Sequence, residues 1–330
     1  MQKSTFIATA LTTMMLATAG WAETLRIAGN FSSEHSSSIA IEQFKAEVEE
    51  VSGGALTIET FPDMALGGAG ENVSQTRAGT IAMTWVGMAY LSRTVPELEA
   101  VSLPFLFPSR EVAYEVIDGE IGELLAEKLD ERGFTLLGMM ELGQRQVTNN
   151  VRPLKTAADL QGLKIRLQPI ESHLATFAAL GANPTPMDIR EVYSAMQQGV
   201  IDGHENPYNL IYASRFFEVQ QYVSNTGHFF DFISVIANKD VFEGLSDEHQ
   251  EIIRTAMANA VASQRAAAAA ADIEALAKLQ ELGMQFDELP PEEIAAIRDL
   301  TADVVDQIRE RAGKELVDGV IAAVEAASGS

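Results

Sequence analysis

Residues 24–61 read TLRIAGNFSSEHSSSIAIEQFKAEVEEVSGGALTIETF, and this stretch decides the fold class. The opening residues 24–28 alternate between apolar and polar side chains, which predicts a strand. Apolar residues then recur at helical spacing from Ile41 to Val51, and Gly53 ends that helix. Residues 56–61 alternate again and predict a second strand. A strand–helix–strand start of this kind is typical of α/β proteins.

The same alternation continues along the chain. Residues 81–86 form a nearly continuous apolar run, which predicts a strand covered on both faces. A second winding of strands and helices is expected to begin at Gly143. Residues 246–282 have a helical pattern throughout, including the alanine run 266–271. At 1.5 Å per residue this helix would be about 55 Å long, enough to lie across two lobes. Two further helices are expected within 292–312.

The first residues have the pattern of a secretory signal peptide. Lys3 supplies a positive charge, residues 6–19 are mostly apolar, and small residues stand at the cleavage positions before Glu23. The apolar run is too short to span a bilayer, so cleavage after Ala22 is preferred over a membrane anchor, the alternative. We therefore expect a periplasmic protein whose mature chain starts at Glu23.

Composition excludes several functional classes. The formal net charge of −24 argues against nucleic acid as a partner, because phosphates require clusters of Lys and Arg. The chain has no cysteine, which excludes disulfides and cysteine-bound metals. The five histidines show no metal-binding spacing, and no Gly-x-Ser-x-Gly elbow occurs. We expect no metal, no cofactor and no catalytic residue. A periplasmic enzyme remains a less favoured alternative, because counting carboxylates cannot exclude an acid pair.

Positive charge is scarce in this acidic chain, so its position is informative. Arg145 opens an expected strand, and Arg166 stands inside another, the apolar segment 164–167. A charge inside such a strand is costly unless it is paired. Arg166 is therefore either part of a structural salt bridge or a guanidinium that makes two parallel bonds to a ligand carboxylate.

Asn206 stands directly before Pro207, a residue that is well tolerated at a helix start. An amide at the N-terminus of a helix has suitable geometry for binding an anion. The alternative is that Asn206 is an ordinary helix cap without a ligand.

Several motifs at fixed spacing resemble one known family, the solute-binding proteins of TRAP (tripartite ATP-independent periplasmic) transporters. The motifs follow one another in the family's order: GQRQVTN (143–149), DLQGLKIR (159–166), LGANPTPM (180–187), EVYSAMQQG (191–199) and DGHENP (202–207). The N-terminal part, with Phe61-Pro62 and Arg77-Ala78-Gly79-Thr80, is similar as well. The resemblance covers essentially the whole mature chain.

The resemblance implies an α/β fold of two lobes, joined by crossing hinge strands and braced by a long helix. The expected division is 1–22 for the signal peptide, 23–142 plus 231–271 for lobe I, and 143–230 plus 272–330 for lobe II. The ligand would be a small organic acid in the cleft between the lobes, delivered to the membrane subunits of a TRAP transporter. The protein would act as a monomer and not as an enzyme.

The resemblance also implies the contacts of the ligand. Arg166 matches the arginine that clamps the ligand carboxylate, Arg145 a second ligand-facing arginine, and Asn206 an asparagine that binds the same carboxylate. Positions that line the family's pocket correspond to Asn30, Trp85 and Ile189. The loops 30–38 and 67–71 would select the rest of the ligand, with His35 and Glu71 as candidate contacts. A binding protein of an ATP-driven transporter is the main alternative function.

Overall fold

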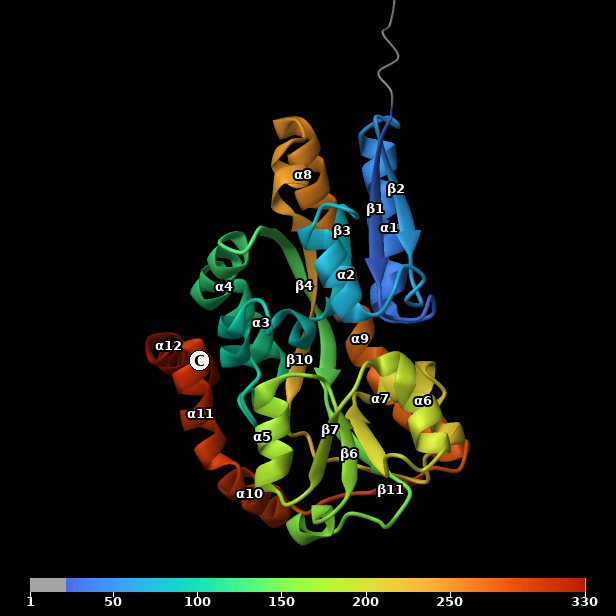
Figure 1. Ribbon diagram of the computed structural model, residues 1–330, viewed down its shortest axis with the longest axis vertical. Coiled ribbons are helices and arrows are strands. Elements are labelled where there is room, and N and C mark those ends of the chain that lie inside the picture. The colour runs from blue at the N-terminus through green and yellow to red at the C-terminus, as the bar shows by residue number, and fades with distance from the viewer. Residues whose placement is uncertain (1–21, 330) are drawn as a thin grey trace, which may run out of the picture.

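The computed structural model describes residues 22–329, and the proposed signal segment lies outside the described residues except for Ala22. Two β-sheets lie one above the other in Figure 1, each covered by helices. The upper sheet holds the N-terminal strands, and the lower sheet holds the strands of the middle of the chain. This arrangement confirms the expected α/β fold with two lobes.

The first sheet has five strands in the order β2-β1-β3-β10-β4. Their bounds are β1 Glu23–Gly29, β2 Leu56–Phe61, β3 Met83–Gly87, β4 Phe134–Gln144 and β10 Phe230–Asn238. Strand β1 pairs in parallel with β2 and β3, whereas β10 is antiparallel to β3 and β4. Helix α1 (Ser36–Val51) buries Ile41 and Phe44 against β1 and β2, as the helical spacing predicts.

The second sheet has six short strands in the order β11-β9-β5-β8-β6-β7. Their bounds are β5 Gln146–Asn149, β6 Lys164–Leu167, β7 Asn183–Pro186, β8 Gly203–Asn206, β9 Tyr222–Ser224 and β11 Gln285–Asp287. The helices of this half are α5 Glu171–Ala179, α6 Ile189–Gln197, α7 Tyr208–Ala213 and α10 Pro291–Leu300. Leu163, Ile165 and Phe177 belong to one of its two apolar cores, and Val192 and Ile211 to the other.

Two strands cross between the two halves of the molecule, each of which is built on one of the sheets. β4 continues into β5 through Arg145, and β10 carries the chain back from the second sheet to the first. β4 and β10 pair with each other along their length, from Phe230 opposite Gln144 to Asn238 opposite Phe134. These are the hinge strands that the family resemblance implies. Residues near the point where they cross lie between the two sheets.

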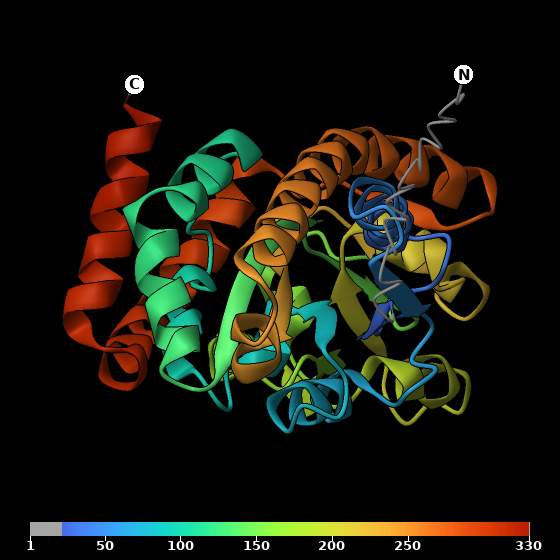
Figure 2. The same cartoon turned by 90° about the horizontal axis from the view of Figure 1, so that it is seen from above.

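Helix α9 (Asp247–Glu281) confirms the expected long helix to within a residue at either end. The Ser246 hydroxyl caps its start by accepting from the His249 N–H at 3.2 Å. The helix packs against α1 and β4 of the first half and against α7 of the second, and it arches across the molecule in orange in Figure 2. The buried Gln264 amide fixes it to β4, accepting from Glu141 N–H and donating to Glu141 C=O, both at 2.8 Å.

The remaining helices complete the first half. They are α2 Ala69–Arg77, α3 Arg110–Asp118, α4 Glu120–Asp130, α8 Lys239–Glu243, α11 Ala302–Ala312 and α12 Lys314–Ser328, with short 3-10 turns at Met88–Leu91 and Pro96–Val101. Two further 3-10 turns, Ala157–Leu160 and Phe216–Glu218, belong to the second half. Helix α12 follows the two helices expected within 292–312, and the sequence patterns did not predict it. Val304 of α11 and Val320 of α12 share an apolar core with Leu125 of α4.

The division of the chain into lobes stays a prediction, but the packing of the C-terminal helices differs from what that division implies. The segment 272–330 was expected to belong wholly to lobe II. Helix α12 instead packs on α3 and on the 3-10 turn Pro96–Val101, both in the expected lobe I, whereas α11 packs on that turn and also on α5 of the expected lobe II. Burying their apolar faces on that core is the physical reason to place 302–328 with lobe I.

Candidate ligand-binding site

A narrow cavity lies between the two sheets, close to the crossing strands. Its walls come from both halves: Asn30, Phe31, Gly87, Tyr90 and Leu142 from the first, and Arg166, Gln168, Ile189, Asn206 and Leu210 from the second. The cavity volume is about 10 Å³, room for about one water molecule. With the two halves in this arrangement, the cavity has no room for a larger ligand.

Arg166 reaches this cavity from β6 and is fully buried. Its Nε and Nη2 donate to the Met187 carbonyl at 2.9 and 2.6 Å, and Nη2 also donates to the Tyr90 hydroxyl at 3.1 Å. Its Nη1 is buried and has no hydrogen-bond partner among residues 22–329. Within the same residues Arg166 forms no ion pair, which removes the structural salt bridge as an explanation of its charge. A buried cation with a free N–H group is suited to an anionic ligand.

Arg145 lies beside the cavity rather than on its wall. It is fully buried, and its side chain bonds to two acids. Nε donates to Glu205, Nη1 to Asp231 at 3.1 Å, and Nη2 to the Glu205 carboxylate at 2.6 Å. Burial is the largest single effect and would raise the pKa of Glu205, but the charge and hydrogen bond of Arg145, together with a hydrogen bond from His228, hold that pKa below its usual value. Arg145 is thus neutralised by the protein, and its expected ligand contact stays a prediction.

The structure brings three more of the expected residues to the cavity. Asn30 is at its wall, with a buried Oδ1 that has no partner among the described residues, and Ile189 provides an apolar wall. Asn206 also lines it, but its amide is engaged on both sides. Its Oδ1 accepts from Arg145 at 3.0 Å, and its Nδ2 lies 2.9 Å from the Nδ1 of His204. An amide nitrogen carries two hydrogens, so the other N–H of Asn206 can still donate to a ligand carboxylate.

Three expected contacts lie elsewhere. Trp85 is buried in β3, and its indole fills the space beside Gly29, where a Cβ would come within 2.2 Å of the ring. His35 caps α1. Glu71 is exposed and accepts from Gly68 N–H at 2.7 Å. It also pairs with Arg190 at 3.2 Å, a contact from α2 to α6 that joins the two halves. None of the three lines the cavity, and their ligand roles stay predictions.

Sequence reasoning did not name Gln168, and it considered Tyr90 only as an aromatic side chain that would suit an apolar or aromatic acid, not as a partner of Arg166. Gln168 stands two residues after Arg166 and directly after the end of β6, so continued strand alternation would place both side chains on one side, a signal that was available. Its Nε2 donates to Asp231 at 3.2 Å, which links the cavity to the acids around Arg145. Tyr90 has no such signal, because only the tertiary fold brings its 3-10 turn to Arg166.

His35 gives the fold a predicted sensitivity to acid. Its Nδ1 accepts from the Ser37 N–H at 3.2 Å, and burial lowers the pKa of His35 to about 4. Since the unfolded chain binds a proton near pH 6.5 and the folded chain does not, this stabilisation is complete above pH 6.5 and is lost on acidification. We expect this residue alone to lower the free energy of unfolding by about 2 kcal/mol between pH 7 and pH 5.

Urea unfolding of His35→Asn at both pH values checks this expectation. Asparagine keeps a capping side chain, so the variant should fold at pH 7. Its loss of stability on acidification should be smaller than that of the wild type by about 2 kcal/mol. An unchanged loss would contradict the assignment to His35.

No helix among residues 22–329 is both long enough and apolar enough to cross a membrane. Comparison with known proteins finds a matching family and several relatives. The family model described as "Bacterial extracellular solute-binding protein, family 7" matches residues 27–312. The 2,3-diketo-L-gulonate-binding periplasmic protein of Escherichia coli (strain K12) is 36% identical over 264 residues, 80% of either chain.

Solved structures are also similar. The sugar acid binding protein of Advenella mimigardefordensis, in complex with galactonate, aligns with a TM-score of 0.91 and 31% identity over 93% of this chain and 99% of that one. A TRAP periplasmic solute binding protein from Sulfurospirillum deleyianum with bound succinate has a TM-score of 0.88 and 29% identity, over 92% and 99% of the two chains.

Proposed function

The chain belongs to family 7 of the bacterial extracellular solute-binding proteins, and from this membership we propose that it captures a small organic acid for a TRAP transporter and delivers it to the membrane subunits. The family resemblance of the sequence is confirmed, and the comparisons support the TRAP function over the ATP-driven alternative. The observation that carries the proposal is the buried guanidinium of Arg166, which has an N–H group without a partner among residues 22–329.

The mechanism is capture by closure. With the lobes apart, the ligand carboxylate docks on Arg166, and closure then brings the Tyr90 hydroxyl of the first half against the guanidinium. Closure removes water, which strengthens a charge-assisted hydrogen bond in the less polar interior. Only contacts that improve on closure shift the equilibrium toward the closed state. Residues from both halves line the cavity, so the ligand gains most of its contacts in that state.

The walls favour a monocarboxylic acid that carries a hydroxyl group. Arg166 is the one cationic side chain that lines the cavity in the described part of the chain. A second carboxylate would lie against Phe31, Leu142 or Leu210 without a compensating charge, which is costly. The free Oδ1 of Asn30 is an acceptor that suits a ligand hydroxyl.

A calorimetric panel tests the ligand class. We expect small 2-hydroxy monocarboxylates to bind about fivefold more tightly than the same acids without the hydroxyl, since one hydrogen bond contributes about 1 kcal/mol. They should also bind more tightly than succinate, whose second carboxylate meets no cation on the cavity wall. Asn30→Leu should remove the preference for the hydroxyl and leave the affinity of the deoxy acid unchanged. Tighter binding of succinate would refute the monocarboxylate class but not the transport function, whereas an absence of binding to every acid would refute both.

Members of this family bind solutes, and we propose further that this protein performs no chemistry on its ligand. The proposal is supported by the inward-facing side chains, which include no pair of nucleophile and base on the cavity wall. Recovery of the bound acid unchanged after prolonged incubation is the expected result. The appearance of a product would contradict it.

The family also implies a periplasmic location. We propose the finer point that residues 1–22 are a cleaved signal peptide, supported by the Gly20-Trp21-Ala22 sequence before Glu23. Intact mass spectrometry of protein exported in a Gram-negative host should show a chain that starts at Glu23. A mass that retains residues 1–22 would contradict cleavage.

A further inference from the structure

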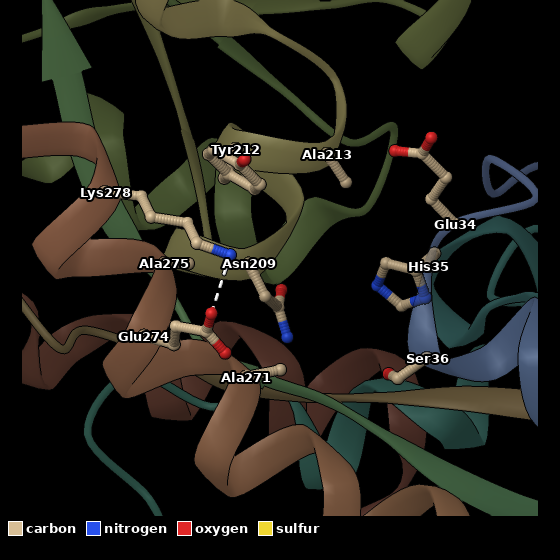
Figure 3. A pocket seen from close by; sticks show the side chains of 10 residues that line it. All are labelled: Glu34, His35, Ser36, Asn209, Tyr212, Ala213, Ala271, Glu274, Ala275 and Lys278. Carbon is tan, nitrogen blue, oxygen red and sulfur yellow. Dashed lines mark ion pairs between the residues drawn. The ribbon is translucent and has the colours of Figure 1, made fainter. Parts of the chain in front are cut away.

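A second pocket lies beside the acid cavity, and neither the sequence patterns nor the family resemblance assigns it a role. Its walls are the start of α1, helix α7 and the C-terminal half of α9, and its volume is about 170 Å³ (Figure 3). Phe31 lines the acid cavity and His35 lines this pocket. Their rings stack with centroids 4.7 Å apart, so they separate the two spaces. We call it the hinge pocket, because α1, α7 and α9 join both halves there.

His35 presents a hydrogen-bond donor to the hinge pocket. Its Nδ1 lies 3.2 Å from the Ser37 nitrogen and 2.8 Å from the Ser37 hydroxyl oxygen; with both groups donating to Nδ1, the proton of the neutral ring is on Nε2. That Nε2 is buried without a partner among the described residues. The His35 side chain is directed into the open space opposite Asn209 in Figure 3. A buried donor of this kind costs free energy unless a molecule in the pocket accepts from it.

Asn209 presents a donor and an acceptor from the opposite wall. Only its backbone N–H is engaged by a side chain, donating to Asp272 at 3.1 Å. Both Oδ1 and Nδ2 are buried without a partner among residues 22–329, although the residue is 8% exposed. In Figure 3 the amide extends into the middle of the pocket, between α9 and the start of α1. The pocket thus offers two donors and one acceptor on facing walls.

The charges around the hinge pocket argue against an anion. Lys278 is already paired with Glu274 at 2.7 Å, the ion pair drawn in Figure 3. Glu34 adds a second carboxylate at the rim, and no ion pair to it occurs in the described part of the chain. The lining therefore carries two carboxylates against one ammonium, and an acid of the kind bound at Arg166 would be repelled.

We propose that the hinge pocket is a second binding site, which takes a small neutral polyol. Hydroxyl groups both donate and accept, so one molecule can satisfy the His35 Nε2–H and both atoms of the Asn209 amide. A neutral molecule avoids the repulsion from Glu34 and Glu274. The alanines of α9, Ala271 and Ala275, leave room for its carbon chain. The site is separate from the acid cavity, so a negative result for polyol binding would not contradict the transport function.

Ligand-observed saturation-transfer NMR tests this site, because thermal shifts would mix binding with the general stabilising effect of polyols. The probes are glycerol, erythritol and ribitol, with choline and acetate as charged comparators. We expect saturable binding of at least one polyol to the wild-type protein. Affinity should fall at least tenfold in Asn209→Leu, which removes the amide, and in Ala271→Leu, which fills the pocket with another good helix former.

Two control variants show whether the polyol binds in the hinge pocket. Ala270→Leu adds the same side chain at the next position of α9, which is exposed and outside the pocket, and should leave polyol binding unchanged. Arg166→Ala should also leave it unchanged, which separates the hinge pocket from the acid cavity. The proposal is overturned by a lack of saturable polyol binding, by equal binding in Asn209→Leu and Ala271→Leu, or by a preference for choline or acetate over every polyol.

Discussion

Replacing Arg166 with alanine is expected to weaken binding of the organic acid by about thirtyfold or more while the protein stays folded. Removing one partner of a buried, hydrogen-bonded charge pair costs roughly 2–5 kcal/mol, and each 1.4 kcal/mol corresponds to about tenfold in affinity. The fold should survive, because the Arg166 side chain bonds only to the Met187 carbonyl and the Tyr90 hydroxyl among the described residues. Isothermal titration calorimetry with the tightest acid of the panel measures the loss.

Two further variants sharpen this experiment. Arg166→Lys keeps the charge but loses the planar fork, so it should recover only part of the affinity. Lys164→Ala is the matched control: Lys164 stands on the same strand β6, is partly exposed, and lies outside the cavity. It should bind the acid as the wild type does. Affinity close to wild type in Arg166→Ala would refute the role of this arginine.

Replacing Arg145 with alanine is expected to act on stability instead. The substitution leaves the carboxylates of Glu205 and Asp231 buried and uncompensated, with relative exposures of 0% and 3%. Breaking a buried ion pair by removing one partner costs roughly 3–5 kcal/mol. We expect urea denaturation at pH 7 to show a free energy of unfolding lower by that amount.

The matched control is Arg215→Ala, which removes an exposed ion pair with Glu218 and should cost under about 1 kcal/mol. If Arg145 instead contacts the ligand, as the family resemblance implies, Arg145→Ala would lose affinity at protein concentrations and temperatures where it remains fully folded. Unchanged stability together with a large loss of affinity would therefore contradict the structural role and restore the ligand contact.

The sequence predicted most of the architecture because its local patterns agree with the tertiary fold. The helical spacing from Ile41 to Val51 and the uninterrupted pattern of 246–282 became α1 and α9. Helix α12 was missed because the expected helix pair stopped at 312, although Val317, Val320 and Val324 bury one face at helical spacing. The placement of α11 and α12 on the first half depends on apolar contacts with residues far away in the chain, which no local pattern contains.

For the candidate site, the sequence by itself identified the few residues that carry positive charge in an acidic chain. Only the tertiary structure decided which of these charges is left unpaired by the protein and can bind an anionic ligand. Arg145 and Arg166 look alike in sequence, each in or beside a strand. The acids that neutralise Arg145 stand 60 and 86 residues further along the chain, brought to it by the pairing of β5 with β8 and by the return of β10. Arg166 meets a carbonyl and a tyrosine hydroxyl instead, because an arginine's free charge depends on its neighbours in space rather than in sequence.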